Sequence, residues 1–353
     1  MLDRLFGLLS HDIGIDLGTA NTLVYVRGKG IVIREPSVVA RHKKTKEILA
    51  IGATAKRMEG RTPATIEAIR PLKDGVIADF DATAAMLSYF IKEVHERPTG
   101  AKLRGLPKIP KPRVVVGIPS GVTEVERRAV QEAALASGAR KAYLIEEPMA
   151  AAIGAGLPVE DPGGIFVVDI GGGTSEIAVI SLGGIVLNQG LRIAGDEMDE
   201  AVMSYLRMRY SLLVGSRSAE EVKISIGSVT ALKNERSAVV RGRDLETGLP
   251  KSIKVTSVEI REALMPVVQQ IVGRIGETLE EAPPELVSDI IERGVLLAGG
   301  GALIPGIDQL IAEVVKVPVW IAEDPLTAVV RGTAKVLEDP KLLDRVRVTG
   351  GLH

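Results

Sequence analysis

Phe-Val-Val-Asp-Ile-Gly-Gly-Gly-Thr-Ser-Glu-Ile-Ala-Val-Ile, at residues 166–180, is the stretch that decides how this chain folds. An apolar, β-branched run ends on Asp169, three glycines and a Thr-Ser pair follow, and a second alternating apolar run begins. This pattern predicts a strand, a tight turn and a returning strand. A glycine turn lets backbone N–H groups approach a ligand closely, and a carboxylate beside it suits a hydrated cation. An ordinary hairpin with a glycine-rich turn is the alternative interpretation.

A second copy of this motif lies near the start of the chain, at residues 13–26 (Ile-Gly-Ile-Asp-Leu-Gly-Thr-Ala-Asn-Thr-Leu-Val-Tyr-Val). Asp16 matches Asp169 and Gly18 matches Gly171, so the copies lie 153 residues apart (169 − 16). A long-range internal repeat of this kind indicates two similar halves. We therefore expect two α/β halves that present their phosphate-binding hairpins to each other across a cleft.

The composition agrees with a two-domain globular protein. The chain has 353 residues, of which 46% are hydrophobic and 25% charged. At the usual size of roughly 150 residues per domain, this length accommodates two domains. The formal net charge is −1, from 44 basic and 45 acidic residues, which gives no general reason to expect nucleic-acid binding.

Several classes of site are excluded or disfavoured. The chain has no cysteine, so disulfides, zinc–thiolate sites and thiol catalysis are excluded, and its four histidines show no metal-ligand spacing. No apolar run reaches the roughly 18 residues of a membrane span. The N-terminus is too short in its apolar part for a signal peptide. We expect a cytoplasmic protein.

The first ten residues show the periodicity of an amphipathic helix. Its apolar face consists of Leu2, Leu5, Phe6 and Leu9. This helix either docks on its own domain or lies on a membrane surface. A single copy would bind lipid weakly because isolated short helices are marginal, whereas many copies on one assembly would bind well.

A basic, irregular segment at residues 98–112 is the second candidate for lipid contact. Its prolines and glycines exclude a helix, and it carries four basic residues and no acid. Its apolar residues are Leu103, Leu106 and Ile109. A solvated linker is the alternative to a loop with apolar tips in lipid and cations at anionic head groups.

Two adjacent carboxylates follow a buried strand in the first half. Residues 142–145 read as a strand that delivers Glu146 and Glu147 to its C-terminal end, after a helix that opens with a capping box at residues 123–126. In an open α/β sheet, ligands bind at this end of the strands. The same half contains a helix at residues 81–96, for which Asp81 is the expected N-cap.

The second half adds two candidate ligand contacts. A capping box at residues 218–221 begins a helix that places Glu220 and Lys223 on one face, where a solvated ion pair is the alternative. A buried strand at residues 295–298 runs into Gly299, Gly300, Gly301 and Ala302, and Pro305 is expected to start the next helix. Such a glycine turn suits a nucleotide base or phosphate. Walker A and GxGxxG patterns are absent.

Four segments follow one another along the chain. They are the hairpin at residues 13–26, residues 145–152 (Ile-Glu-Glu-Pro-Met-Ala-Ala-Ala), the hairpin at residues 166–180 and residues 298–306 (Ala-Gly-Gly-Gly-Ala-Leu-Ile-Pro-Gly). With them the chain resembles the superfamily of actin, sugar kinases and heat-shock ATPases. It is most similar to the rod-shape-determining bacterial actins of the MreB family. The resemblance covers nearly the whole chain. Ser216, Ser218 and the long basic loop depart from the family pattern.

The resemblance implies an α/β, actin-like ATPase fold of two ribonuclease-H-like subdomains around a nucleotide cleft, each with a small α+β insertion. Domain I would comprise residues 1–155 and 325–353, with its insertion at about 31–65. Domain II would comprise residues 156–324, with its insertion at about 186–255.

The resemblance also implies roles for individual residues. ATP phosphates would be held from one side by Gly18, Thr19, Ala20 and Asn21, and from the other by Gly171, Gly172, Gly173 and Thr174. Mg²⁺ would be held by Asp16 and Asp169, through its waters. The ribose and base would meet Glu220 and Lys223, and the adenine side would be formed by Gly299 to Ala302. Glu147 would orient the attacking water, with Glu146 as the less favoured neighbour, and Thr174 would assist.

The function implied is that of a slow, ATP-hydrolysing cytoskeletal protein. It would form head-to-tail filaments of paired protofilaments at the inner face of the cytoplasmic membrane, bind a RodZ-type adaptor, and organise cell-wall synthesis and cell shape. A small-molecule kinase of the same superfamily is the alternative, although residues 31–110 offer no recognisable sugar pocket. A chaperone would need a peptide-binding domain after the cleft.

Overall fold

The computed structural model describes residues 12–96 and 111–348. The expected lipid-contacting residues Leu2, Leu5, Phe6, Leu9, Leu103, Leu106 and Ile109 lie outside these ranges. The chain divides into two compact units. Unit 1 comprises Met1–Asp161, Leu182–Gly184 and Thr327–His353, and unit 2 comprises Pro162–Ser181 and Ile185–Leu326.

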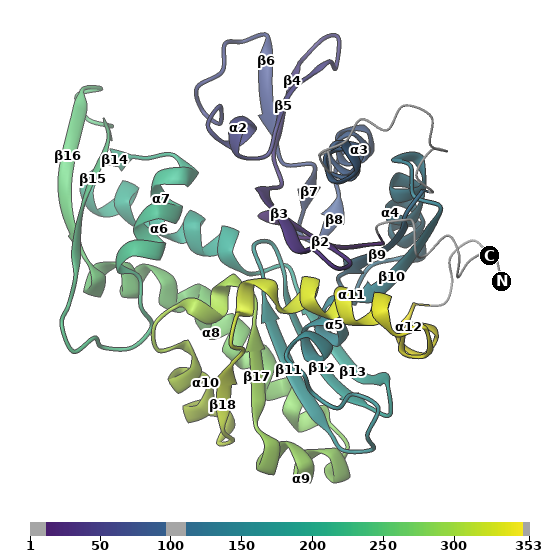
Figure 1. Cartoon of the computed structure of the whole chain (residues 1–353). Helices are drawn as coiled ribbons and strands as arrows, with labels where there is room; N and C mark the ends of the chain where they lie inside the picture. The colour runs from purple at the N-terminus through teal and green to yellow at the C-terminus, as the bar shows by residue number, and fades with distance from the viewer. Residues whose placement is uncertain (1–11, 97–110, 349–353) are drawn as a thin grey trace. The chain divides into compact units, whose positions relative to one another are not determined.

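Unit 1 is built on a five-stranded sheet in the order β10-β9-β1-β2-β3 (Figure 1). The first motif copy forms β1 (Ile13–Leu17) and β2 (Asn21–Val26), which pair antiparallel, and β3 (Gly30–Pro36) continues this meander. On the other side, β9 (Arg113–Ile118) pairs parallel with β1, and β10 (Lys141–Glu146) pairs parallel with β9. The predicted hairpin at residues 13–26 is therefore confirmed.

Helices cover both faces of this sheet, because successive side chains of a strand point to opposite sides. Ile13, Ile15 and Leu17 of β1 belong to a core that includes α3 (Phe80–Glu96) and α4 (Glu124–Ala136). The alternate residues face the other way, where α5 (Glu147–Gly154) and α11 (Ala328–Glu338) contact β9 and β1.

Glycines allow α5 and α11 to approach closely. A Cβ on Gly154 would collide with the Ala328 carbonyl oxygen, and one on Gly332 would collide with the Ala150 carbonyl oxygen. The unit closes with α12 (Pro340–Val346), whose first N–H groups are capped by Asp339. The C-terminal segment thus completes the layer against which β1 and β9 pack.

A small insertion follows β3. It contains β4 (Val39–His42), β5 (Ile48–Ile51), α2 (Ala53–Lys56), β6 (Ile66–Ile69), β7 (Leu72–Lys73) and β8 (Val76–Ile77). The strands β5, β4 and β6 form one three-stranded antiparallel sheet, and β7 and β8 form a separate pair.

Arg41 of the insertion ties its sheet to the start of α3. Its guanidinium contacts Glu67 of β6 and Asp79, each at 2.7 Å. Asp79 also accepts a hydrogen bond from the Ala82 N–H at 3.0 Å, which makes Asp79 the cap of α3. The prediction of Asp81 as the cap was wrong, because the helix begins at Phe80 and its third N–H is that of Ala82.

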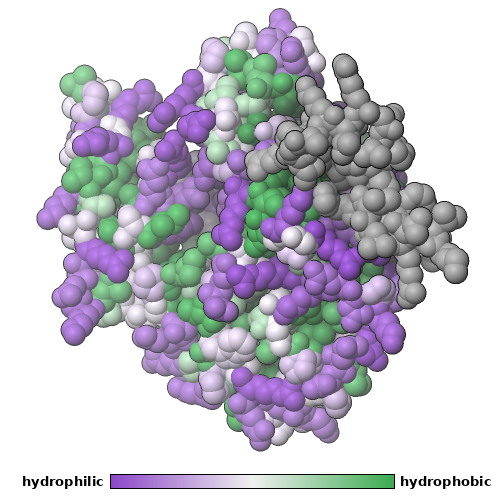
Figure 2. Space-filling model, viewed as in Figure 1, coloured by the Kyte–Doolittle hydropathy of each residue, from purple (hydrophilic) through white to green (hydrophobic). Residues whose placement is uncertain are grey.

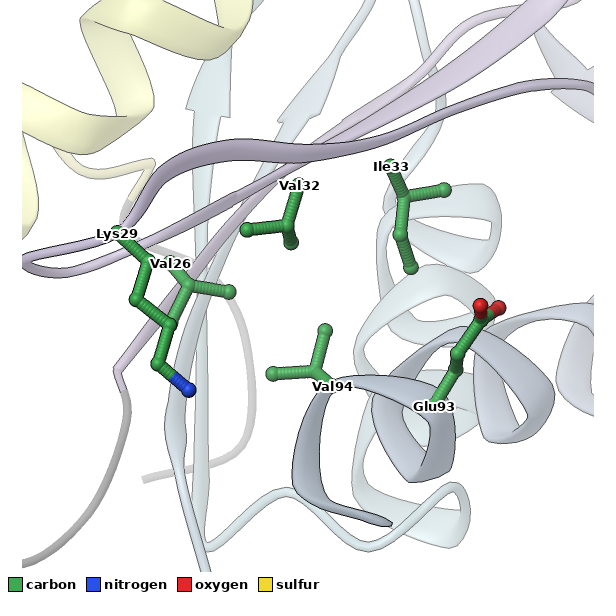
Figure 3. A pocket seen from close by; sticks show the side chains of 6 residues that line it. All are labelled: Val26, Lys29, Val32, Ile33, Glu93 and Val94. Atoms are coloured by element: carbon green, nitrogen blue, oxygen red, sulfur yellow. The ribbon is translucent and has the colours of Figure 1, made fainter. Parts of the chain in front are cut away.

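Unit 1 contains a small apolar cavity of about 200 Å³ between the β2–β3 hairpin and the end of α3 (Figure 3). Valine and isoleucine side chains point into it, and a lysine and a glutamate lie at its edge. Its lining residues are Val26, Lys29, Val32, Ile33, Glu93 and Val94. The expected nucleotide contacts are not among them, so this cavity is separate from the candidate site.

Unit 2 repeats the sheet topology, with the order β13-β12-β11-β17-β18. The second motif copy forms β11 (Ile165–Ile170) and β12 (Ser175–Ser181), which pair antiparallel, and β13 (Gly184–Leu191) is the outer strand. On the other side, β17 (Val295–Ala298) pairs parallel with β11, and β18 (Val319–Ile321) with β17. The sequence repeat is therefore a repeat of fold.

The helices of unit 2 bury one large core against this sheet. They are α6 (Gly195–Tyr210), α7 (Ser216–Ile226), α8 (Ser257–Glu281), α9 (Pro284–Arg293) and α10 (Ile307–Val315). A small sheet of β14 (Leu212–Leu213), β15 (Ser237–Asp244) and β16 (Pro250–Thr256) inserts between α6 and α8. The strands β15 and β16 pair antiparallel as a hairpin.

Two predicted helix starts in unit 2 were wrong. The capping box at Ser218 does not form, because α7 begins at Ser216 with Gly215 as its N-cap. The Arg217–Glu221 ion pair at 2.9 Å, which needs both residues in the helix, favours this earlier start. Pro305 does not open α10, which starts at Ile307 after Gly306 adopts a left-handed conformation.

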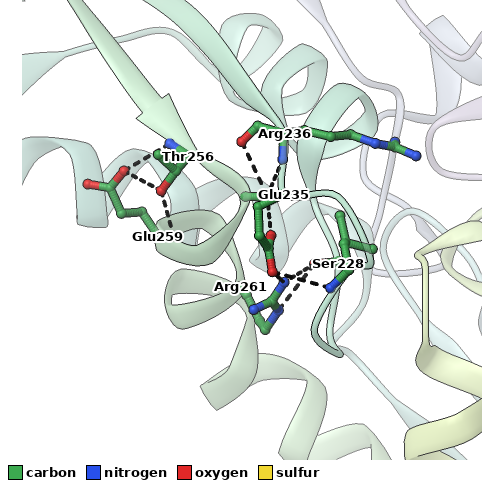
Figure 4. Close-up of polar contacts among 8 residues, drawn as sticks. Ser228, Glu235, Arg236, Thr256, Glu259 and Arg261 are labelled. Carbon is green, nitrogen blue, oxygen red and sulfur yellow. Dashed lines mark hydrogen bonds and ion pairs between the residues drawn. The ribbon is translucent and has the colours of Figure 1, made fainter.

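A polar cluster fixes the small sheet to the start of α8 (Figure 4). Arg261 of α8 donates to Ser228 Oγ at 3.0 Å and contacts Glu235 at 2.7 Å. Ser257 at the start of the helix donates to Glu235, and Thr256 forms a capping box with Glu259. The loop between α7 and β15 is held at both its ends.

Hydrophilic side chains cover much of the face in Figure 2, and apolar ones appear among them over the small sheet of unit 2. Val239, Leu245 and Leu249 are exposed there, at 62%, 44% and 64%. In the described part of the chain, the helices are all too short or too polar to cross a membrane.

Candidate functional site

The turn of the first hairpin is a compact three-residue loop that requires glycine at its first position. A Cβ on Gly18 would lie 2.6 Å from the Asn21 carbonyl oxygen, closer than two such atoms can approach. Thr19 is buried, and its hydroxyl accepts a hydrogen bond from the Gly75 N–H at 3.3 Å. Because a hydroxyl also donates, Thr19 can still give its proton to a ligand oxygen.

Ser37, which the sequence did not indicate, holds this turn from behind. Its hydroxyl donates to the Gly18 carbonyl oxygen at 2.6 Å, and its N–H donates to the Ala20 carbonyl oxygen at 3.0 Å. The Thr22 hydroxyl lies 2.8 Å from the Ser37 hydroxyl, and both residues are fully buried. The backbone of the turn is thereby fixed before any ligand binds.

Asp16 and Glu147 lie at the same edge of the unit 1 sheet. Asp16 is in register with Gly117 of β9. A Cβ on Gly117 would lie 3.6 Å from Glu147 Cγ, so the Glu147 side chain sits against that strand. As predicted, β10 delivers both glutamates to its C-terminal end, where Glu146 is the last residue of the strand and Glu147 is the first residue of α5.

The environment of Glu146 does not favour an ionised carboxylate. Burial raises the pKa of Glu146, and the nearby Arg127 only partly offsets this. A carboxylate that orients a water molecule must be ionised to accept its hydrogen bond. The raised pKa therefore disfavours Glu146 for that role.

The turn of the second hairpin, residues 171–174, is closed by a hydrogen bond from the Gly171 N–H to the Thr174 carbonyl oxygen at 2.8 Å. Asp169, at the end of β11, is 6% exposed. Burial raises the pKa of the Asp169 carboxyl to about 7. The site therefore disfavours the ionised carboxylate until a cation is present.

The glycine turn after β17 packs directly on Asp169. Ala298 is in register with Asp169, and a Cβ on Gly299, which has a φ of +78°, would collide with the Asp169 carboxylate. A Cβ on Gly301 would collide with the Ile170 side chain. Residues 300–303 form a short 3₁₀ helix. The structure thus brings the 299–302 turn and the second hairpin together.

The start of α6 contacts the second hairpin turn, which the sequence interpretation missed. The Gly195 N–H donates to the Gly171 carbonyl oxygen at 3.3 Å, and the Asp196 N–H donates to the Gly172 carbonyl oxygen at 2.7 Å. These contacts depend on tertiary packing, which no local periodicity of the sequence predicts.

Lys223 of α7 also reaches this region. Its ammonium donates to the Gly195 carbonyl oxygen at 2.7 Å and pairs with Asp199 of α6 at 2.8 Å. Burial raises the pKa of Asp199 to about 6 against the lowering effect of Lys223, and nearby Glu220 adds a smaller upward contribution. The simple alternative of an exposed Glu220–Lys223 pair is therefore wrong for Lys223, whose ionic partner is Asp199.

The residues present fit a magnesium–nucleotide complex. Asp169 is a buried carboxyl whose pKa is raised by burial, and a cation bound beside it would favour its ionised form. Within residues 12–96 and 111–348, no three His, Asp or Glu residues cluster closely enough to hold a metal ion. A Mg²⁺ ion bound here would take most of its ligands from phosphates and water, as it prefers.

Comparisons with known proteins agree with this geometry. Residues 10–345 match the family model described as MreB/Mbl protein. The chain is 52% identical over 342 residues to the cell shape-determining protein MreB of Escherichia coli (strain K12), covering 96% of each chain. It is 48% identical to the cell shape-determining protein Mbl of Bacillus subtilis (strain 168), covering 97% of this chain and all of Mbl.

Among solved structures, MreB 5 of Spiroplasma citri bound to AMPPNP superposes with a TM-score of 0.86. It is 40% identical and covers 93% of this chain and 96% of that one. The repeated sheet topology, the paired Asp–Gly hairpins and this superposition define an actin-like α/β protein.

The chain belongs to the MreB/Mbl family of cell shape-determining proteins. This confirms the predicted resemblance, the fold class and the function in bacterial cell shape. The small-molecule kinase alternative is not favoured, because the relatives are cell shape-determining proteins over nearly their whole length.

Proposed function

We propose that this chain binds ATP with Mg²⁺, hydrolyses it slowly and uses it to control self-association into filaments. The main support is the duplicated Asp–Gly hairpin, with one copy in each unit and the same sheet topology around each. The S. citri relative is bound to AMPPNP, a nucleotide. We also propose that units 1 and 2 correspond to the two nucleotide-binding domains.

In this proposal the two hairpin turns bind the phosphates. Gly18 to Asn21 act in unit 1, and Gly171 to Thr174 act in unit 2. Backbone N–H groups at a glycine turn suit phosphate oxygens, since they bring donors close without a side chain in the way. The bound ion would supply charge neutralisation at the phosphates, with Asp16 and Asp169 holding its waters.

The remaining expected contacts fall in unit 2 and around Glu147. Gly299 to Ala302 would accept the flat face of the base. Lys223 has three ammonium donors, of which two are used by Asp199 and Gly195, so the third can reach the ribose beside Glu220. Glu147 would accept a hydrogen bond from the attacking water and orient it towards the terminal phosphate.

We make two further proposals, one on membrane and adaptor binding and one on the surface for self-association. Filaments would associate with the cytoplasmic membrane from its inner face through the apolar residues of the N-terminal segment and of the 98–112 segment, and would engage a RodZ-type adaptor and the cell-wall elongation machinery. The exposed apolar side chains of Val239, Leu245 and Leu249 on the small sheet make it a candidate surface for self-association.

A turnover experiment with two variants tests the role of Glu147. Glu147→Ala should lower ATP turnover on the order of a hundredfold, the size typical of losing a positioned acid–base group. Binding of ATP, measured by calorimetry, should change little. Glu146→Ala, which removes the neighbouring carboxyl, is the matched control and should retain most of the turnover. If Glu147→Ala keeps full turnover and Glu146→Ala loses it, Glu146 and not Glu147 orients the attacking water.

A further inference from the structure

A buried ion pair connects α6 and α7 beside the second hairpin turn. Asp199 and Lys223 are 2.8 Å apart, with side chains only 8% and 12% exposed. A buried pair of this kind adds little net stability, because both charges lose their hydration. Stability therefore does not explain why this ion pair is buried.

The ammonium of Lys223 is fixed by two acceptors at once. Asp199 holds it from one side, and the Gly195 carbonyl oxygen accepts its hydrogen bond at 2.7 Å. Lysine has a long, flexible stem with several rotatable bonds, so a single contact would not fix its position. The carboxylate of Asp199 selects the one orientation in which the ammonium reaches Gly195.

Gly195 in turn lies directly against the glycine turn. A Cβ on Gly195 would lie 3.3 Å from the Gly171 carbonyl oxygen, 3.4 Å from Lys223 Nζ and 3.5 Å from Gly172 Cα. The Gly195 and Asp196 N–H groups donate to the carbonyl oxygens of Gly171 and Gly172. The start of α6 is therefore enclosed between the lysine and the turn.

A second contact prevents the start of α6 from moving independently. The buried Ser175 hydroxyl, at the first residue of β12, donates to the Ile193 carbonyl oxygen at 2.7 Å. The Ala194 N–H donates to Glu197 at 2.7 Å. With the segment held on that side, the Lys223 contact decides where Gly195 and Asp196 place the turn.

We propose that Asp199 is a positioning residue for the turn at Gly171–Gly173, acting through Lys223 and the first residues of α6. This inference rests on the proposed nucleotide function and adds to it a residue that does not touch the nucleotide. Because the turn would face the terminal phosphate, loss of Asp199 should affect the chemical step more than nucleotide binding.

The test compares ATP turnover with ADP affinity in the full chain. Asp199→Asn keeps the shape of the side chain and removes its charge. It should lower kcat on the order of tenfold, as is typical for groups that orient a site from behind. It should weaken the binding of ADP, which keeps the ribose near Lys223 but lacks the terminal phosphate, by a smaller factor than it lowers kcat. Asp199→Glu, which retains the carboxylate, should restore most of kcat.

Four further variants separate positioning from general stability. Glu200→Gln removes an exposed charge from the next residue of α6 and should behave as wild type. In the double variant Asp199→Asn/Lys223→Met, kcat should fall no further than in Lys223→Met alone, because both changes break one connection. Gly195→Ala should lower kcat with both charges intact.

Three outcomes would overturn the inference. The first is wild-type kcat in Asp199→Asn, the second is additive losses in the double variant, and the third is an equal loss of kcat and ADP affinity that follows a lower Tm. If the wild-type chain neither binds nor hydrolyses ATP, the proposed function itself fails, which is a different result.

Discussion

Among single residues, Asp169 narrows the range of possible functions most. Its carboxyl is buried at the end of β11, against Gly299, and burial raises its pKa to about 7. Near neutral pH the ligand-free chain therefore carries this group partly protonated. A divalent cation would favour the ionised form, so cation binding and proton release are expected to be linked.

Replacing Asp169 with Asn should remove a pH dependence of stability. The folded pKa of about 7 lies above the ordinary value of 3.8, so the folded state keeps a proton that the unfolded state has lost. This contribution to the free energy of unfolding is present below the ordinary value and is lost as pH rises to about 7. Without ligand, Asp169→Asn should therefore not lose this contribution to the free energy of unfolding as pH rises.

Thermal unfolding at pH 5 and pH 8, without nucleotide or metal, measures the effect. The Tm of Asp169→Asn minus the Tm of wild type should be larger at pH 8 than at pH 5. Asp161→Asn, at an exposed carboxyl, is the control and should follow wild type at both. An Asp169→Asn curve parallel to that of wild type would contradict the raised pKa.

Residues whose role follows from local pattern could be predicted from the sequence, and the others could not. Asp16 and Asp169 were placed at strand ends because apolar runs stop there, and the strands confirm both positions. Ser37 supports a turn 19 residues earlier, and Asp199 meets a lysine on another helix. No local periodicity encodes such contacts, so both residues were missed.

At the scale of elements, Arg41 connects the insertion of unit 1 to α3. The hydrogen bond from Arg41 lowers the pKa of Glu67. Burial acts to raise the pKa of Asp79, but the Ala82 N–H and Arg41 together bring it below its ordinary value. Both carboxylates are therefore stabilised in their ionised form, and the Arg41 guanidinium contributes to both.

Arg41→Met should cost about 2 kcal/mol of stability at neutral pH, as expected for losing hydrogen bonds between charged groups. Because the folded pKa values are lowered, the contribution is present above the ordinary carboxyl pKa and is lost as pH falls through the folded values. The Tm difference between wild type and Arg41→Met should thus shrink between pH 7 and pH 3.

Arg128→Met is the matched control for this element. Arg128 pairs with Glu124 at 3.3 Å on the exposed surface of α4, where ion pairs contribute little. Its Tm should stay near that of wild type at both pH values. An Arg41→Met difference as large at pH 3 as at pH 7 would show that packing, and not charge, carries the effect.

Helix ends show where prediction from the sequence stops. The capping box at Thr123 forms as predicted. The Ser218 box matches the same pattern but does not form, because helix-compatible residues precede it and α7 starts two residues earlier. Asp79 was missed because Asp81 looks equally suitable, and only the position of Arg41 beside the chain separates them.

At the level of the whole molecule, the two units repeat one topology. Each unit has, at the centre of a five-stranded sheet, a strand with Asp as its next-to-last residue, next to a glycine turn and a parallel strand. The 153-residue repeat predicted this fold, because hairpin and strand patterns are local and occur twice. The arrangement of subsites in unit 2 needed the structure, since Gly299 and Gly195 reach the turn only through tertiary packing.

We propose that nucleotide binding controls filament formation. Light scattering of the purified full chain over a range of concentrations, with and without Mg-ATP, tests this directly. We predict a critical concentration for scattering that falls when Mg-ATP is added. Absence of nucleotide-dependent scattering at every concentration would contradict the claim.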